Sequence, residues 1–269
     1  MVASGHRAGL GYFAPMSAFL DHPLPLAIAH RGGTLDGIEN TMASFGQAVA
    51  MGYRYLETDV RVTSDGELVA FHDATVERVV GSAGRIRELN WSQLSALRVG
   101  GREPIPRFAE VLKTWPDARF VVDPKCDAAV EPLIRVLRDL DAVERVCVGS
   151  FDDDRLRQVR RVIGPSLCTS MGPGEVLRLR LAAWRMLSPR AVPLAAACVQ
   201  MPLRYGPVPI AEPRCIDFAH ELGLQVHVWT INDRATMRRL LDLGVDGIIT
   251  DDIAGLRTIL EQRGQWHGA

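Results

Sequence analysis

Charged side chains stand at the ends of apolar, strand-like segments in the first half of the chain. They are His30 and Arg31 after one segment, Glu57 and Asp59 within the next, and Asp123 and Lys125 at the end of a third. When parallel strands form a barrel, active sites are built at the carboxyl ends of the strands. We therefore expect these six side chains to meet in one site.

The spacing of the carboxylates predicts a metal site. Glu57 and Asp59 are two residues apart, so on a strand both project from the same face. Two carboxylates in a low-dielectric interior repel each other unless a cation lies between them or one is protonated. A lone pair of this kind is also typical of a solvated strand face, but Asp123 at the next strand end favours an all-oxygen site for Mg²⁺ or Ca²⁺.

Two histidines and two cations complete the candidate site. His30 follows an apolar run, and His72 follows Val69-Ala70-Phe71, so each stands at a strand end where one could act as acid and the other as base. Arg31 offers a planar fork for phosphate oxygens, and Lys125 offers a compact positive charge. This combination of residues predicts an anionic, phosphate-like substrate.

The elements that must position these residues alternate between strand and helix. Eight strands are expected at 26–30, 55–60, 119–123, 145–150, 166–170, 197–201, 225–231 and 247–250. Helical spacing separates most of them, at 42–49, 130–140, 153–163, 215–222 and 234–243. Such alternation predicts an α/β fold, the (β/α)₈ TIM barrel. Asp65-Gly66 predicts a small β-hairpin insertion after the second strand, which returns His72 towards Glu57 and Asp59.

Composition limits the function further. The chain has 269 residues, with 31 Lys and Arg against 32 Asp and Glu, so no basic excess favours nucleic acid. No uncharged apolar stretch reaches about 18 residues, and the first 25 residues contain no continuous apolar core of a signal peptide. These features predict a cytoplasmic protein with an extension over 1–25, one barrel over 26–262 and a tail over 263–269.

The five cysteines have no spacing typical of a metal site or a disulfide framework. They are Cys126, Cys147, Cys168, Cys198 and Cys215. Most lie in apolar strand-like runs, so we interpret them as small hydrophobic residues of a reducing compartment.

In the residues described above, the chain resembles the glycerophosphodiester phosphodiesterase family. The matching segments are His30-Arg31-Gly32 with Glu39-Asn40-Thr41, Glu57-Thr58-Asp59-Val60, Thr63 with Asp65-Gly66, His72-Asp73, Asp123 with Lys125, Val228-Trp229-Thr230-Ile231-Asn232, and Asp246-Gly247-Ile248-Ile249-Thr250-Asp251. They keep the family's order from about residue 26 to 260, which is nearly the whole chain.

The resemblance implies a barrel that hydrolyses glycerophosphodiesters to glycerol 3-phosphate and an alcohol, with one divalent cation, Mg²⁺ or Ca²⁺. It implies that His30 and His72 form the acid-base pair, that Arg31 and Lys125 meet the phosphate, that Trp229 lines the substrate pocket, and that Glu57, Asp59 and Asp123 bind the metal. The family often has Glu in place of Asp123, and Pro in place of Ile38. Glu39 either orients Arg31 or begins a helix, and it stays outside the metal set.

Three further segments have local interpretations. Residues 175–187 form a basic apolar helix candidate, which is expected to pack on the barrel but could make transient contact with a lipid surface. Residues 201–210 form a Pro-rich loop that could select substrates. Asp152-Asp153-Asp154 is expected to begin a helix rather than bind metal.

Two other functions stay open beside the leading one. A lysophospholipase D-like enzyme would act on a substrate that keeps one acyl chain, and the basic apolar segment motivates it. A barrel that binds a phosphodiester without hydrolysing it is the other, because fold alone does not guarantee activity. The presence of both histidines and of three carboxylates argues against a barrel that only binds.

Overall fold

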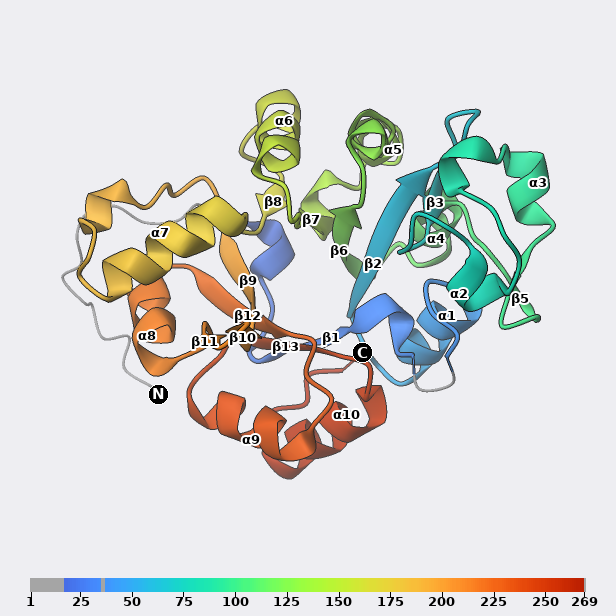
Figure 1. Ribbon diagram of the computed structural model, residues 1–269. Helices are drawn as coiled ribbons and strands as arrows, with labels where there is room; N and C mark the ends of the chain where they lie inside the picture. The colour runs from blue at the N-terminus through green and yellow to red at the C-terminus, as the bar shows by residue number, and fades with distance from the viewer. Residues whose placement is uncertain (1–16, 35–36, 269) are drawn as a thin grey trace.

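The computed structural model describes residues 17–34 and 37–268; residues 1–16 of the expected extension lie outside the described part. Eight parallel strands form a nearly closed barrel (Figure 1). They are β1 (Leu26–Ala29), β2 (Tyr55–Val62), β6 (Arg119–Pro124), β7 (Val146–Val148), β8 (Cys168–Thr169), β9 (Cys198–Pro202), β12 (Gln225–Trp229) and β13 (Gly247–Thr250). The order β8-β7-β6-β2-β1-β13-β12-β9 closes through a bridge between Ser170 and Cys198. The predicted TIM barrel is confirmed.

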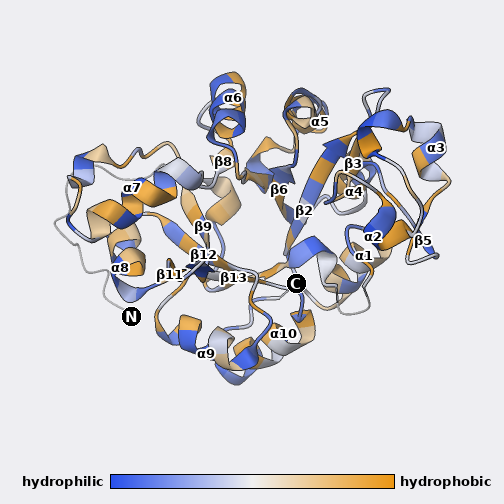
Figure 2. Cartoon of the chain, viewed as in Figure 1, coloured by the Kyte–Doolittle hydropathy of each residue, from blue (hydrophilic) through white to orange (hydrophobic). Residues whose placement is uncertain are grey.

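Helices cover the outside of the barrel (Figure 1). They are α1 (Met42–Ala50), α4 (Phe108–Thr114), α5 (Val130–Asp139), α6 (Asp153–Ile163), α7 (Pro173–Ala183), α8 (Pro213–Glu221), α9 (Arg234–Asp242) and α10 (Ile253–Gln262). Figure 2 shows apolar and polar residues sharing these helices. In α5 the buried residues Val130, Leu133, Ile134 and Leu137 recur at helical spacing, so one face packs on the strands.

Helix ends follow the predicted signals. Thr41 caps α1 by accepting a hydrogen bond from the Ser44 amide, and the Asp152 side chain accepts hydrogen bonds from the first turn of α6. The acidic run at 152–154 therefore begins a helix, as expected. Helix α7 ends at Ala183, earlier than the predicted segment, and Leu179 and Ala182 are the residues that it buries.

The N-terminal end of the barrel is closed by the segment that precedes β1. A short 3₁₀ helix, η1 (Ala18–Leu20), places Phe19 in the barrel interior with no exposed surface. The Tyr55 hydroxyl and the Arg119 guanidinium both donate to the carbonyl of Phe19, at 2.7 and 3.0 Å. Because Tyr55 and Arg119 begin β2 and β6, Phe19 lies at the end of the barrel away from the candidate site.

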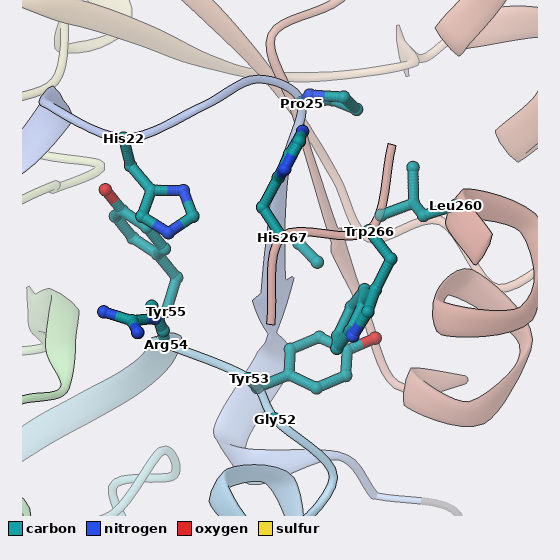
Figure 3. A pocket seen from close by; sticks show the side chains of 10 residues that line it. His22, Pro25, Gly52, Tyr53, Arg54, Tyr55, Leu260, Trp266 and His267 are labelled. Atoms are coloured by element: carbon teal, nitrogen blue, oxygen red, sulfur yellow. The ribbon is translucent and has the colours of Figure 1, made fainter. Parts of the chain in front are cut away.

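The C-terminal tail packs against the same end of the molecule (Figure 3). The rings of Trp266 and Tyr53 meet edge to face at 5.1 Å, and the His267 ring approaches that of His22 at 6.4 Å. The cavity between them has a volume of about 10 Å³, roughly the space for one water molecule. We interpret it as a packing feature rather than a ligand site.

A layer of short elements follows the second barrel strand. Strand β3 (Leu68–Ala70) pairs antiparallel with β2, so the predicted hairpin is present. The insertion continues through α2 (Glu77–Val80), η3 (Ile86–Glu88), α3 (Trp91–Ser95), β4 (Arg98–Val99) and β5 (Glu103–Pro104), around an apolar cluster of its own. The insertion is thus larger than the predicted hairpin. Its residue Arg78 contacts Asp73, which follows His72.

A second hairpin replaces the expected Pro-rich loop after β9. Strands β10 (Arg204–Tyr205) and β11 (Val208–Pro209) pair antiparallel, with Gly206 at a positive φ of 57° in the turn between them. Within the described part of the chain, no helix has the length and apolarity to cross a membrane.

Candidate active site

The turn after β1 aims Arg31 into the barrel mouth. Residues 30–32 form the 3₁₀ helix η2 (His30–Gly32), in which Arg31 has a φ of 52° and Gly32 a φ of 85°. A Cβ atom on Gly32 would lie 2.7 Å from the carbonyl carbon of Ser44 in α1. Glycine is therefore required for the turn to pack on this helix. The Arg31 amide donates to Glu57 Oε2 at 3.1 Å, which ties the turn to β2.

A carboxylate holds His30 by one ring nitrogen. His30 Nδ1 lies 2.7 Å from Asp251 Oδ1, and His30 Nε2 lies 3.8 Å from Glu57 Oε2. Asn232 Nδ2 donates to the other oxygen of Asp251 at 2.7 Å. Burial alone would lower the pKa of His30, but Glu57 and Asp251 outweigh this effect and raise the pKa. The ring is thereby oriented with Nε2 towards Glu57.

His72, in the insertion after β2, also has a carboxylate at its Nδ1 atom. His72 Nδ1 lies 2.6 Å from Asp73 Oδ1, and Arg78 Nε donates to the other oxygen of Asp73 at 2.5 Å. Arg78 also donates to both oxygens of Glu39, at 2.6 and 2.9 Å. Glu39 in turn accepts from Arg31 Nη1 at 2.9 Å. Of the two interpretations of Glu39, its contact with Arg31 is the one that the structure contains, because helix α1 begins only at Met42.

Two cations neutralise the buried carboxylates. Lys125 Nζ lies 2.8 Å from Asp59 Oδ1 and 2.6 Å from Asp123 Oδ2, and Arg31 Nε lies 3.0 Å from Asp59 Oδ2. Asn40 Nδ2 donates to Asp59 Oδ2 at 3.1 Å. The register pairs Asp59 with Asp123 on neighbouring strands. Within the described residues, the oxygens of Glu57, Asp59 and Asp123 do not all lie within 4.8 Å of one another, and Lys125 stands between Asp59 and Asp123.

The three carboxylates differ in how well they are neutralised. Burial raises the pKa of Glu57 to about 7, and the charge of Asp59 adds to the shift. Burial also raises the pKa of Asp123, although Lys125 opposes it. For Asp59 burial would raise the pKa, but Lys125 and Arg31 hold it below its usual value. Asp123 Oδ1 is buried without a hydrogen-bond partner. Further positive charge beside Glu57 and Asp123 would therefore stabilise their ionised forms.

An aromatic pair lies beside Lys125. The ring of Trp229, at the end of β12, contacts that of Phe151 edge to face at 5.3 Å, and Lys125 Nζ lies 5.4 Å from the centre of the Phe151 ring. The Phe151 side chain is 65% exposed. Seven of the eight side chains that the sequence proposes for the site are thus linked directly or through one neighbour, whereas His72 is connected to Arg31 only through Asp73, Arg78 and Glu39.

Sequence reasoning missed the partners of the histidines and the second aromatic residue. Asp73 and Asp251 both lie in the matching segments, but their contacts with His72 and His30 depend on how the hairpin folds and on the pairing of β1 with β13. Phe151 follows β7 and precedes an acidic helix start, and neither signal indicates a ligand. Arg78 lies in the insertion, where the sequence predicted no further elements.

Comparisons with known proteins identify the family of the chain. Residues 30–254 match the Glycerophosphoryl diester phosphodiesterase family. The chain belongs to this family. It is accordingly a phosphoric diester hydrolase by membership, and the resemblance stated from the motifs is confirmed.

Individual relatives cover almost the whole chain. The "Probable glycerophosphodiester phosphodiesterase 2" of Mycobacterium tuberculosis is 38% identical over 95% of this chain and 98% of its own length. A solved Silicibacter pomeroyi protein named after the same activity has a TM-score of 0.77 at 26% identity and covers 93% of this chain and 99% of its own. An Oleispira antarctica phosphodiesterase, solved with its product sn-glycerol-3-phosphate, has a TM-score of 0.74 at 22% identity, with 91% and 100% coverage.

Proposed function

We propose that the protein hydrolyses glycerophosphodiesters to glycerol 3-phosphate and an alcohol, with His30 and His72 as the acid-base pair. The observation that carries this proposal is the matched arrangement of the two histidines. Each has a carboxylate at Nδ1, Asp251 or Asp73, which leaves Nε2 available for proton transfer. A hydrolysis needs two such groups, since the nucleophile loses a proton and the leaving alkoxide gains one.

Arg31 and Lys125 supply the positive charge that an anionic diester requires. Arg31 Nε lies 3.0 Å from Asp59 Oδ2 without making a well-directed hydrogen bond, and Glu39 accepts from Nη1 of the same guanidinium. A phosphate oxygen can accept from this donor without breaking the contact with Glu39. The two cations stabilise the charge that develops on the non-bridging oxygens as the bond from phosphorus to the alcohol oxygen breaks.

Glu57, Asp59 and Asp123 would hold one divalent cation, Mg²⁺ or Ca²⁺. The chemistry of these residues fits such an ion, because three hard carboxylate donors lie on two neighbouring strands and Asp123 Oδ1 lacks any partner, although Lys125 stands where the oxygens of Asp59 and Asp123 would converge. When bound, the ion would polarise the phosphoryl group and offset its charge. Lys125, which now neutralises Asp59 and Asp123, would then be available to the phosphate.

The histidines divide the proton transfers between them. One removes a proton from the attacking oxygen, which belongs either to water or to the neighbouring glycerol hydroxyl of the substrate. The other protonates the alcohol that leaves, so a new bond from phosphorus to oxygen forms as the old one breaks. Asp251 and Asp73 keep each ring oriented and stabilise its protonated form.

The test measures release of glycerol 3-phosphate from glycerophosphocholine after the protein has been stripped with a chelator. We expect turnover only after Mg²⁺ or Ca²⁺ is restored, and we expect His30→Asn and His72→Asn to lower kcat at least about 100-fold. His220→Asn, a histidine that contacts Asp246 on the outside of the barrel, serves as the matched control. Full turnover in the chelated protein would refute the requirement for a metal ion. Full turnover in either histidine variant would refute the assignment of His30 and His72 as the acid-base pair.

A lysophospholipase D-like reaction is the second candidate, and the exposed Phe151 ring beside Trp229 favours it. An acyl chain could lie against this aromatic pair while the phosphate meets Lys125. Parallel assays with lysophosphatidylcholine decide between the substrates. Turnover confined to the acylated substrate, and reduced by Phe151→Ala, supports the second candidate. Activity on neither substrate points either to a diester with another head group or to a barrel that only binds.

A further inference from the structure

Three cysteine side chains converge inside the barrel. The sulfur atoms of Cys147, Cys168 and Cys198 all lie within 4.8 Å of one another, and the Sγ atoms of Cys147 and Cys198 are 3.8 Å apart. Each residue is at most 1% exposed. Among the residues that the structure describes, no other set of three metal-ligating side chains comes so close together.

The barrel architecture brings these residues together although 21 and 30 positions separate them. Cys147 lies on β7, Cys168 on β8 and Cys198 on β9, which are consecutive around the barrel. The register pairs Cys147 directly with Cys168, and the bridge between Ser170 and Cys198 sets the height of the third residue. All three belong to the apolar cluster that fills the interior, so their thiols point inward.

The Cys147–Cys198 sulfur distance of 3.8 Å matches that of two thiolates bound to a single ion, and the third sulfur lies within 4.8 Å of both. With a metal–sulfur bond of about 2.3 Å, ligand sulfurs lie about 3.8 Å apart in tetrahedral and about 4.0 Å apart in trigonal coordination. A disulfide would need two of the sulfurs to approach to about 2.05 Å and would leave the third unused. We propose that Cys147, Cys168 and Cys198 form a binding site for one soft, thiolate-seeking metal ion, separate from the carboxylates at the mouth.

The surroundings of the cluster indicate which ion fits. Outside the three sulfurs, Cys198 Sγ lies 4.0 Å from the carbonyl of Thr169, which is too long for coordination, and the side chains of Ser17 and His227 lie near Cys168. Zn²⁺ prefers four ligands; the ring nitrogens of His227, which lies near Cys168, are already within 3.4 Å of the side-chain amides of Gln200 and Gln225. Soft thiolate ligands also select Cu(I), which is satisfied by three sulfurs. Each coordinating thiol loses its proton as its sulfur–metal bond forms, and no electron is transferred.

A polar layer links the cluster to the barrel mouth. Gly149, Ser170 and Gln200 each follow one of the cysteines by two residues and therefore face the same side. The layer is closely packed at Gly149, since a Cβ atom on it would lie 3.1 Å from Gln200 Oε1 and 3.8 Å from Ser170 Oγ.

The experiment measures metal content and affinity in the full chain. Protein is produced in copper-supplemented and in zinc-supplemented medium, and bound metal is counted by mass spectrometry. Reduced, metal-free protein is also titrated anaerobically with Cu(I) against a chromogenic Cu(I) chelator. We expect one copper per chain, ultraviolet sulfur-to-copper charge-transfer absorption, and X-ray absorption showing three sulfur ligands in the wild-type protein.

Variants distinguish the cluster from the other thiols. Cys147→Ser and Cys198→Ser should each weaken Cu(I) binding at least about 100-fold, whereas Cys126→Ser and Cys215→Ser, outside the cluster, should not. Because a core variant could fail to fold, the sulfur count in the wild-type protein provides an independent test. No copper uptake by either route, or fewer than three sulfur ligands, overturns the site. Zinc bound with an added oxygen or nitrogen ligand overturns the assignment to copper.

Discussion

His227 gives the protein a sensitivity to acid whose size can be worked out. The side chain is fully buried on β12, and burial lowers its pKa from 6.5 to about 4. Its ring nitrogens lie 3.4 and 3.3 Å from the side-chain amides of Gln200 and Gln225, while the charges of Asp246 and Cys168 oppose the lowering of the pKa. The folded state therefore holds His227 neutral at pH values where the unfolded chain protonates it.

The sign and magnitude follow from linkage. Between pH 6.5 and 4 the unfolded state binds more protons, so the free energy of unfolding falls as the pH falls. The shift of about 2.5 pH units, 6.5 minus 4, corresponds to about 3 kcal/mol at 1.36 kcal/mol per unit. Glu57 acts in the opposite direction, because its folded pKa of about 7 lies above its unfolded value of 4.5 and favours the folded state as the pH falls. The wild-type profile alone thus understates the contribution of His227.

A difference experiment isolates this contribution. Urea unfolding of the wild-type protein and of His227→Gln is followed from pH 7 to pH 4, and the advantage of the wild-type protein should decrease by about 3 kcal/mol across this range. Val228→Ala, which removes buried volume from the same strand, should shift stability by an amount that does not depend on pH. If the wild-type and His227→Gln profiles stay parallel, His227 does not titrate as its surroundings indicate.

Three further predictions concern the turn, the cation and the seal of the barrel. Gly32→Ala should destabilise the protein by more than about 1 kcal/mol and abolish turnover, because the added Cβ would meet Ser44. The control in thermal melts and activity assays is Gly37→Ala, where φ is similar but the space around the added Cβ is open. Lys125→Met should lower kcat/KM at least about 100-fold, whereas exposed Lys113→Met should not; equal activity would show that Lys125 does not serve the phosphate. Phe19→Ala should lower the free energy of unfolding, measured with urea, by about 3–5 kcal/mol. Tyr205→Ala should leave it almost unchanged, because Tyr205 is 79% exposed. Similar losses in the two variants would contradict the interpretation that Phe19 closes the N-terminal end of the barrel.

The barrel was predictable because its signals are regular. Each predicted strand overlaps an observed one, since buried parallel strands are apolar throughout and glycines such as Gly244 mark where a helix ends. The insertion after β3 was not predictable beyond its first hairpin. Helices α2 and α3 have four and five residues, too few for an apolar period to appear, and they are stabilised by the cluster around Ile86 and Leu94.

The site residues that stand at strand ends were predictable from the sequence. The residue pairs that depend on tertiary contacts were not. His30, Glu57 and Asp123 follow from their place after apolar segments. The pairing of His72 with Asp73, and the fixing of Asp73 by Arg78, depend on the folded insertion. The cysteine cluster was not predicted for a related reason. Metal-ligand spacing is recognised in a sequence when the ligands share one loop, whereas these three sulfurs meet only when β7, β8 and β9 lie side by side.

The two halves of the barrel mouth suit the two parts of a diester. The turn and strands from β1 to β6 contribute Arg31, Asp59 and Lys125, so this half is charged and, on the proposed function, would bind the phosphate and its counterion. The loops after β7 and β12 contribute Phe151 and Trp229, which meet Lys125 at the boundary. A substrate with its phosphate at Lys125 therefore directs one alcohol towards the aromatic pair. On this argument the residues after β7 and β12 select the alcohol, while those after β1, β2 and β6 set the chemistry, so variants of Phe151 should alter substrate preference without changing the dependence on His30 and His72.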